Sequence, residues 1–76
     1  METIEMTFGE KACGVSFNPG AREDVDSIKR RFAEVVDLLH EHRLDATPEV
    51  AQMLSVAITK AQTAQMWAVK AVTWGN

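Results

Sequence analysis

Hydrophobic positions recur at helical spacing through the last third of the chain, from Thr47 to Trp74. Pro48 suits the first position of a helix, where its missing N–H costs no hydrogen bond, and Thr47 suits the N-cap before it. No further Gly or Pro follows until Gly75. The sequence therefore predicts one helix over residues 48–74, roughly 40 Å long at about 1.5 Å per residue.

This predicted helix carries two apolar stripes when its residues are plotted at about 100° each. The first stripe is nearly all alanine in its middle and consists of Val50, Met53, Leu54, Ala57, Ala61, Ala64, Ala68, Ala71 and Val72. The second stripe, roughly 100° round the helix, holds Val56, Trp67 and Trp74, with Lys60 and Thr63 between them. Because one partner helix cannot cover both, we expect the first stripe to face the chain's own other helix. We expect the second to face another copy of the protein.

A second amphipathic pattern predicts a helix over about residues 24–43. Its apolar stripe has near-heptad spacing and holds Val25, Ile28, Phe32, Val35, Val36 and Leu39. Acidic residues at its start and Arg43 at its end suit the helix dipole. The short segment from Leu44 to Ala46 forces the two helices to run antiparallel. The predicted fold class is therefore all-α, an antiparallel helical hairpin that assembles as a homo-oligomer.

The residues before the hairpin predict a short N-terminal helix or arm followed by a turn. The turn is indicated by Asn18-Pro19-Gly20, in which proline presets φ and glycine accepts a positive φ. We expect a single domain over residues 1–76, in which the arm and turn occupy 1–20 and the hairpin occupies 24–74.

Three side chains outside the predicted core each allow two interpretations. Phe8 is either an apolar plug on the hairpin or a residue that stacks on a base. Phe17 either anchors the turn to the core or forms an aromatic platform at the rim of a pocket, where stacking is worth about 1–3 kcal/mol per base. Lys70, near the tryptophan stripe, either lies at an interface or only adds surface charge.

The three consecutive cations Lys29, Arg30 and Arg31 point in different directions on the predicted helix. Such a run usually forms a solvated face, and ion pairs of Arg30 with Asp26 and with Glu34 at i,i+4 spacing fit that explanation. Lys29 and Arg31 each flank apolar surface instead. That position suits a contact with a ligand at a subunit boundary.

Composition narrows the possible classes of protein. A chain of 76 residues buries only about 60% of its unfolded surface and is marginally stable alone, so oligomerisation is expected. The single Cys13 and the absence of a signal-peptide pattern predict a reducing cytoplasm. The net charge of −3 argues against a protein that coats DNA or RNA. No apolar run approaches the roughly 20 residues that span a membrane.

No catalytic or metal-binding pattern emerges from the sequence. His40 and His42 lie on different sides of the predicted helix, which excludes the i,i+3 or i,i+4 spacing of helical metal ligands. There is no nucleophile motif, phosphate-binding glycine loop or credible carboxylate pair. We therefore predict no enzyme. Two alternatives stay open: a protein–protein interaction module without a nucleotide ligand, and a small phosphodiesterase, which would need a general base or metal.

The chain nevertheless contains three specific segments, SFNP, VD-x-IK and TAQMWAVKAVTW. Through them, and over about residues 7–74, it resembles the phage anti-CBASS sponge family, small proteins that share a helical hairpin domain with the Thoeris-inhibiting sponges. The resemblance implies a phage immune-evasion protein in the cytoplasm of the infected bacterium. Such a protein binds and sequesters cyclic di- or trinucleotide messengers without cleaving them. The resemblance also implies a homohexamer with cyclic dinucleotides, such as cyclic GMP-AMP, between protomers.

The resemblance also implies roles for particular residues. In the dinucleotide pockets of the family, an aromatic residue near the N-terminus stacks on a base and a lysine contacts phosphate. Lys29 of VD-x-IK is then the expected phosphate contact, and Phe17 or Phe8 is the expected stacking residue. The chain has no tyrosine, so neither supplies a hydroxyl group. Arg31 and Lys70 are candidates for a second pocket. The full set of expected ligand-binding residues is Lys29, Phe17, Phe8, Asn18, Arg31 and Lys70.

Overall fold

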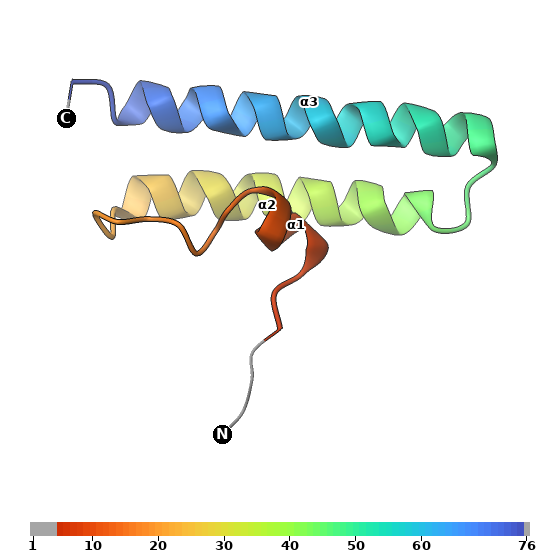
Figure 1. The fold of residues 1–76 in the computed structure, drawn as a ribbon, viewed down its shortest axis with the longest axis horizontal. Coiled ribbons are helices and arrows are strands. Elements are labelled where there is room, and N and C mark those ends of the chain that lie inside the picture. The colour runs from red at the N-terminus through yellow and green to blue at the C-terminus, as the bar shows by residue number, and fades with distance from the viewer. Residues whose placement is uncertain (1–4, 76) are drawn as a thin grey trace.

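The computed structural model describes residues 5–75 and contains two long antiparallel helices, with a short helix against one of them (Figure 1). The helices are α1 (Phe8–Ala12), α2 (Glu23–Arg43) and α3 (Pro48–Val72). No strand occurs in this described part. The predicted all-α antiparallel hairpin is therefore confirmed. Residues 1–4 of the predicted arm lie outside the described residues.

The predicted helix boundaries are close to the observed ones. The first long helix begins at Glu23, one position before the predicted start, and ends at Arg43 as predicted. The second ends at Val72 rather than at residue 74, because Thr73 departs from helical geometry with φ −103° and ψ 6°. Within residues 5–75, neither long helix is apolar enough along its length to cross a membrane.

Capping hydrogen bonds fix where two of the helices begin. At α1, Glu10 N donates to Thr7 Oγ1 at 3.0 Å and Thr7 N donates to Glu10 Oε1 at 2.8 Å, which is a reciprocal capping box. At α3, Val50 N donates to Thr47 Oγ1 at 3.4 Å, and Pro48 follows as the first helical residue. The predicted start of α3 is thus confirmed together with its physical cause.

Helix α1 docks against the middle of α2 at a point with no room for a side chain. Gly9 N donates to Asp37 Oδ1 at 2.7 Å. A Cβ on Gly9 would lie only 2.1 Å from Ala33 O, so only glycine fits at this crossing. Gln62 Nε2 also donates to Ala12 O at 3.2 Å, which joins α1 to α3. The short helix is therefore attached to both long ones.

The core is small and lies where α1 and the residues after it meet the two long helices. Its buried hydrophobic side chains are Cys13, Val15, Val25, Ala33, Val36 and Ile58. Two polar side chains, Lys29 and Gln65, are also buried. Burial raises the pKa of the Cys13 thiol; the charge of Asp37 adds to this shift and that of Lys29 opposes it.

The first apolar stripe of α3 is only partly directed at α2, which corrects the prediction. The buried and half-buried side chains that line the core side of α3 include Leu54, Ile58, Ala61, Gln65, Ala68 and Val72. The exposed members of the predicted stripe are Val50, Met53, Ala64 and Ala71. The core-facing row is rotated by roughly 60° from the prediction. It is rotated because α3 also packs on the segment after α1, where Ile58 joins Cys13 and Val15 in one cluster.

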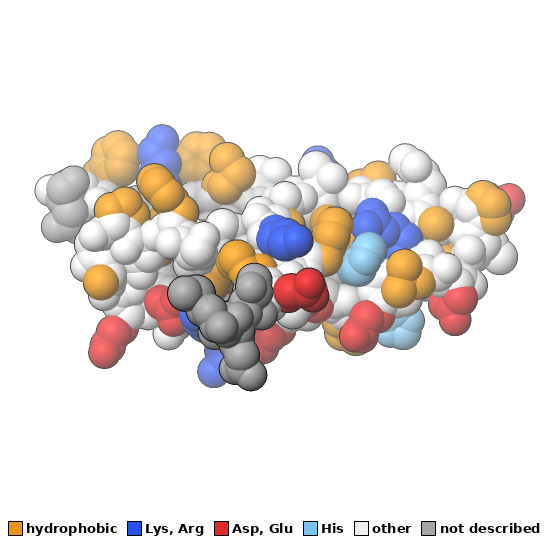
Figure 2. Space-filling model, turned by 60° about the horizontal axis from the view of Figure 1, so that its bottom comes forward, with side chains coloured by type: hydrophobic (Ala, Val, Ile, Leu, Met, Phe, Trp, Pro, Cys, Tyr) orange, Lys and Arg blue, Asp and Glu red, His pale blue; other side chains and the backbone are white. Residues whose placement is uncertain are grey.

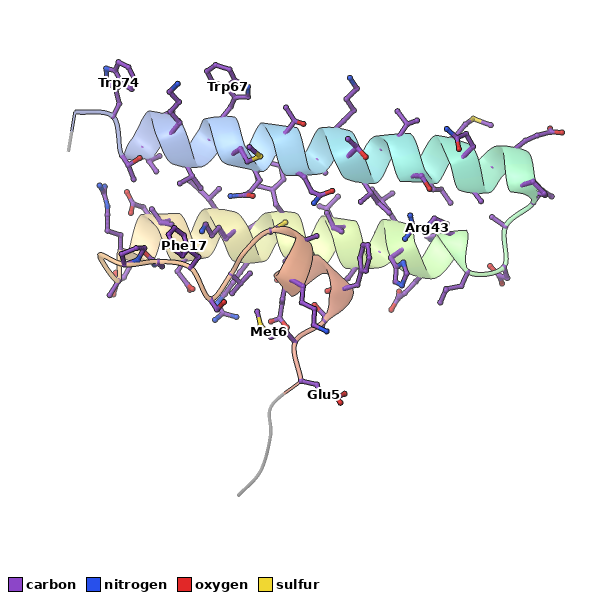
Figure 3. The ribbon with its side chains drawn as sticks, viewed as in Figure 1. Glu5, Met6, Phe17, Arg43, Trp67 and Trp74 are labelled. Atoms are coloured by element: carbon purple, nitrogen blue, oxygen red, sulfur yellow. The ribbon has the colours of Figure 1, made fainter. Side chains whose placement is uncertain are left out.

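The second apolar stripe of α3 is not covered by α2, as predicted, and its labelled tryptophans point away from the hairpin (Figure 3). The exposed fraction is 65% for Trp67 and 75% for Trp74. Lys70 lies between them, with Nζ 5.0 Å from the Trp67 ring centroid and 5.8 Å from the Trp74 ring. Hydrophobic side chains gather on the surface near this end of α3 (Figure 2). A second copy as their partner stays a prediction.

The chain turns at Asn18, Pro19 and Gly20 as predicted, but the positive φ lies elsewhere. Ala21 has φ 50°, whereas Gly20 is not among the residues with positive φ. Ala21 N donates to Asn18 O at 2.9 Å. The Asn18 side chain binds the next residue, donating to Arg22 O at 2.9 Å and accepting from Arg22 N at 3.2 Å. These bonds on either side hold Ala21 in the left-handed conformation.

One of the two predicted ion pairs of Arg30 is present and the other is wrong. Arg30 binds Asp26 at 2.9 Å. It does not pair with Glu34 but reaches Glu10 of α1 at 3.6 Å, while Glu34 lies 3.8 Å from Arg31. The reason is the docking of α1, which brings the Glu10 carboxylate close to Arg30 of α2. Helical spacing within α2 alone cannot predict this contact.

Candidate functional site

A hollow of about 160 Å³ lies at the end of the hairpin where the turn meets the last turns of α3. Three parts of the chain form it: the connection before α2, the first two turns of α2, and the end of α3. Its lining residues are Phe17, Asn18, Pro19, Gly20, Arg22, Val25, Lys29, Val69 and Thr73. The hollow thus combines an apolar lining with one aromatic ring and two cations, and three of the six predicted site residues line it.

Lys29 forms the buried cation of the hollow. Its side chain comes from α2 and is only 7% exposed. Its Nζ donates to Gly14 O at 3.0 Å and also to Phe17 O. The same Nζ lies 5.4 Å from the centroid of the Phe17 ring. The predicted lysine therefore lies beside the predicted aromatic residue, and two of its three N–H groups bind backbone carbonyls.

Phe17 is the exposed aromatic residue of the hollow, and Figure 3 places it beside the first turns of α2. Its exposed fraction is 71%. A ring that anchored the turn to the core would be largely buried, so the packing interpretation of Phe17 is wrong. The platform interpretation is compatible with this exposure, but its binding role stays a prediction.

Asn18 shapes the turn beneath this aromatic ring. Its amide nitrogen and its amide oxygen are both engaged by the backbone of Arg22. These two hydrogen bonds are a structural reason for asparagine at this position, and no ligand is needed to explain it. The side chain lines the hollow, so a ligand contact stays a prediction.

Arg22 is a site residue that the sequence interpretation missed. Its Nε and Nη2 donate to Asp24 at 3.1 and 2.7 Å, and Nη2 also donates to Val72 O at 3.1 Å. The hydrogen bond from Arg22 lowers the pKa of the Asp24 carboxyl. Arg22 also lines a wider, open hollow of about 570 Å³ at the start of α2. The sequence could have pointed to Arg22 only through its position between the turn and α2. Its contact with Val72 of α3 joins residues 50 positions apart and cannot be inferred from local patterns.

Phe8 lies away from this hollow, so the two candidate aromatic residues are not in one site. Its ring stacks on His40 of α2, with centroids 4.2 Å apart and an interplanar angle of 11°. Arg43 lies over the same ring at 5.4 Å and donates to His40 Nδ1 at 2.8 Å. His40 is roughly 16 Å further along α2 than Lys29, at about 1.5 Å per residue. These contacts support the interpretation of Phe8 as a plug on the hairpin.

Arg31 and Lys70, the candidates for a second pocket, also lie outside the hollow. The Arg31 side chain is 81% exposed and pairs only loosely with Glu34. Lys70 lines a separate shallow hollow of about 280 Å³ with Met66 and Trp67. The structure does not bring Arg31 and Lys70 together with the Phe17 hollow. A role for either residue in a second pocket stays a prediction.

Residues suited to metal binding do not gather in the described part of the chain. Within residues 5–75, no group of three or more His, Cys, Asp or Glu side chains is arranged to hold an ion. The two histidines differ in their surroundings, since His40 stacks on Phe8 whereas His42 is exposed. Candidate chemistry in the hollow is accordingly stacking by an aromatic ring and hydrogen bonding by cations.

Comparison with known proteins identifies the family of the chain. The family model described as "Acb2/Tad1, hairpin domain" matches residues 10–73. Searches of curated proteins and of solved structures found no match. The matched residues include the whole hollow, both long helices, the segments SFNP and VD-x-IK, and TAQMWAVKAVTW except for its last residue, Trp74. The sponge family inferred from those segments is thereby confirmed. The chain belongs to the Acb2/Tad1 hairpin domain family, which is known for binding cyclic nucleotides as sponges.

Proposed function

We propose that this protein binds cyclic di- or trinucleotide messengers of CBASS defence and sequesters them without cleaving them. The observation that carries the proposal is the pairing of the exposed Phe17 ring with the Lys29 cation in one hollow. An aromatic face and a cation match the two recurrent parts of a nucleotide, its base and its phosphate. Both residues lie in the segment that belongs to a family of cyclic-nucleotide sponges.

In this proposal each residue of the hollow has a separate task. Phe17 stacks on a base, an interaction worth about 1–3 kcal/mol. Lys29 directs the N–H group that is not bound to a carbonyl toward a phosphate oxygen, and such charge-assisted hydrogen bonds are stronger than neutral ones. Arg22 lies close enough to the same hollow to add a second cation. Cyclic GMP-AMP serves as the first candidate ligand.

The size of the hollow supports a site that is completed by a second protomer. Pockets for drug-sized ligands usually enclose about 300–1,000 Å³, whereas this hollow encloses about 160 Å³. A cyclic dinucleotide would need a further wall. The exposed stripe of Trp67 and Trp74 and the exposed alanines of α3 offer contact surfaces for another copy. We therefore propose a homo-oligomer, with the hexamer implied by the family resemblance as its expected form.

The residues around the hollow favour binding over hydrolysis. None of the lining side chains in the described part is a carboxylate, histidine or cysteine, the groups that most often act as general base, nucleophile or metal ligand. Membership of a sponge family points the same way. The proposed activity requires only tight binding by an abundant protein, because each bound messenger is removed from its effector.

A release experiment tests the proposal directly. Purified protein is mixed with cyclic GMP-AMP, unbound nucleotide is removed by filtration, the protein is denatured, and the released compound is identified by chromatography. Intact cyclic GMP-AMP supports sequestration, and a linear product would establish an enzyme instead. If nothing is retained, a panel of cyclic di- and trinucleotides is tested in the same way. Retention of none of them would contradict the proposal.

A second candidate function is a protein–protein interaction module without a nucleotide ligand. The observation that favours it is the exposed edge formed by Trp67, Lys70 and Trp74, which could dock on another protein. The two proposals differ in what Phe17 does. Under the first proposal the parent protein retains messenger and Phe17→Ala weakens this retention. Under the second proposal the parent protein retains no messenger, and Phe17→Ala leaves docking through the tryptophan edge unchanged.

A further inference from the structure

The irregular segment between α1 and α2 is held by one side chain that reaches it from α2. Lys29 Nζ donates to Gly14 O at 3.0 Å and to Phe17 O. Gly14 O also accepts a hydrogen bond from Phe17 N at 2.9 Å, so residues 14–17 form a closed turn. The ammonium group therefore binds both ends of this turn, including the residue that carries the exposed aromatic ring.

The charge of Lys29 makes this attachment stronger than an ordinary lysine contact on the surface. The side chain is 7% exposed, and none of the ion pairs found within residues 5–75 includes it. Backbone carbonyls therefore replace the water that an exposed ammonium would bind. Removing the ammonium group takes a hydrogen bond from Gly14 O and from Phe17 O, and only Gly14 O keeps another donor, Phe17 N. A partly buried carbonyl left without its hydrogen bond is costly. The position of the turn is thus coupled to the lysine.

The Phe17 ring has few other contacts that could hold it in place. It is 71% exposed, and its ring centroid lies 5.4 Å from Lys29 Nζ, within the range of a cation–π interaction. Both the backbone and the ring of Phe17 are therefore oriented by the same ammonium group. A stacking residue that is ordered before its ligand arrives loses less entropy on binding, which raises affinity.

We propose that Lys29 is a positioning residue, which orders the turn at residues 14–17 and presents the Phe17 ring before any ligand binds. The inference rests on the proposed function for its consequence in binding, because it deepens the role of the same site. It assigns Lys29 two tasks, of which the contact with phosphate is only one. A substitution of Lys29 then lowers affinity partly through Phe17.

Hydrogen exchange of the ligand-free protein tests the positioning role without reference to the function. In Lys29→Met, which keeps the length of the side chain and removes its donors, we expect the Phe17 amide to exchange at least about tenfold faster than in the parent protein. Lys11→Met is the matched control, since Lys11 lies on the exposed side of α1. Unchanged exchange of the Phe17 amide in Lys29→Met would overturn the proposal.

A second measurement needs no substitution and covers the case in which Lys29→Met unfolds. The side-chain ammonium protons of the parent protein are observed by nitrogen-15 NMR near neutral pH. Hydrogen bonds to two carbonyls should slow their exchange with water, so that Lys29 gives a separate signal while Lys11 does not. An ammonium signal of Lys29 that behaves like that of Lys11 would contradict the proposed attachment.

A double-mutant cycle then separates positioning from direct phosphate contact, provided that a ligand binds. Affinity is measured for Lys29→Met, Phe17→Ala and the double variant. If Lys29 acts partly through Phe17, the fold-loss caused by Lys29→Met becomes smaller once the ring is absent. Strictly multiplicative losses would mean that the two residues act independently, and would reject the positioning role in binding. If no cyclic nucleotide binds the parent protein, the proposed function fails, while the exchange experiment still decides the positioning role.

Discussion

In the sequence, Phe8 and Phe17 are both candidates for stacking on a base. In the structure their surroundings differ. Phe8 is 41% exposed, but its ring already stacks on His40, and Arg43 lies 5.4 Å from the ring centroid, so partners for this ring come from the chain itself. Phe17 is exposed beside the ammonium of Lys29, and its ring has room for a further partner. The difference shows that an aromatic ring that already stacks within the chain is a weaker candidate for ligand stacking than an exposed ring without an aromatic partner.

The largest expected effect is on stability and comes from disrupting α1, the helix that carries Phe8. Gly9→Ala places a Cβ within 2.1 Å of Ala33 O, so α1 must move and the Phe8 cluster loses its attachment. We expect a loss of about 2–3 kcal/mol in the free energy of unfolding, measured by denaturant titration. Gly20→Ala is the control, because its Cβ would meet only the Arg22 side chain at 3.5 Å. Equal stability of the two variants would contradict the docking of α1.

The next effect concerns binding. We expect Phe17→Ala to weaken binding of cyclic GMP-AMP by about 10- to 100-fold, since stacking on a base is worth about 1–3 kcal/mol. Phe8→Ala should change the same affinity by less than about threefold, because its ring already stacks on His40. Isothermal titration calorimetry measures both. A large loss in Phe8→Ala with none in Phe17→Ala would reverse the assignment.

Phe8→Ala and Phe17→Ala should also differ in stability, but here Phe8→Ala should have the larger effect. Phe8→Ala removes an aromatic stack and a cation–π contact, each worth roughly 0.5–1.5 kcal/mol. We expect a lower free energy of unfolding by about 1–2 kcal/mol, and a change below about 0.5 kcal/mol for the exposed Phe17→Ala. Thermal unfolding followed by circular dichroism provides the measurement. Similar losses in both would mean that Phe8 is not a structural plug.

The smallest effect is expected at the Asp24 carboxyl, which binds Arg22, a residue that lines the hollow containing Phe17. The hydrogen bond from Arg22 lowers the pKa of Asp24 below its usual 3.8 in the folded state. Its contribution to stability is therefore present above that value and is lost as the pH falls toward the lowered pKa. We expect Asp24→Asn to have a slightly lower melting temperature than the parent protein at pH 6, with the difference shrinking as the pH falls below 3.8. A difference that grows on acidification would contradict the assigned direction.

Local features of the sequence predict the helices well. Thr47 and Pro48 mark the start of α3 because capping and the missing proline N–H are local effects. The hydrophobic period and the short loop then predict the antiparallel hairpin. The sequence also places Lys29 and Phe17 in one site, but only through the family resemblance. The hydrogen bonds from Lys29 to the carbonyls of Gly14 and Phe17 depend on how the turn lies against α2. The hydrophobic periodicity of the sequence does not predict that arrangement.

Other features depend on contacts between distant segments and could not be predicted. The stripe of α3 that faces the core is rotated because Ile58 also packs on residues after α1. The role of Arg22 could not be predicted because its partner, Val72, lies 50 residues away in the sequence. The choice between Phe8 and Phe17 depends on where α1 docks, which is set by the lack of a side chain at Gly9. Each case is a tertiary contact that local propensity does not specify.

The hydrogen bond from Arg22 to Val72 O has a kinetic consequence. A connecting loop joins α2 and α3 at one end only, so the last turns of α3 are free to fray unless something clasps them. Arg22 is that clasp, and it borders the hollow that contains Phe17. Under the proposed function, escape of a bound nucleotide and fraying of the α3 terminus should then share one opening event. The residence time of the proposed ligand would then depend on how long the hydrogen bond from Arg22 to Val72 O lasts, as well as on contacts with the ligand itself.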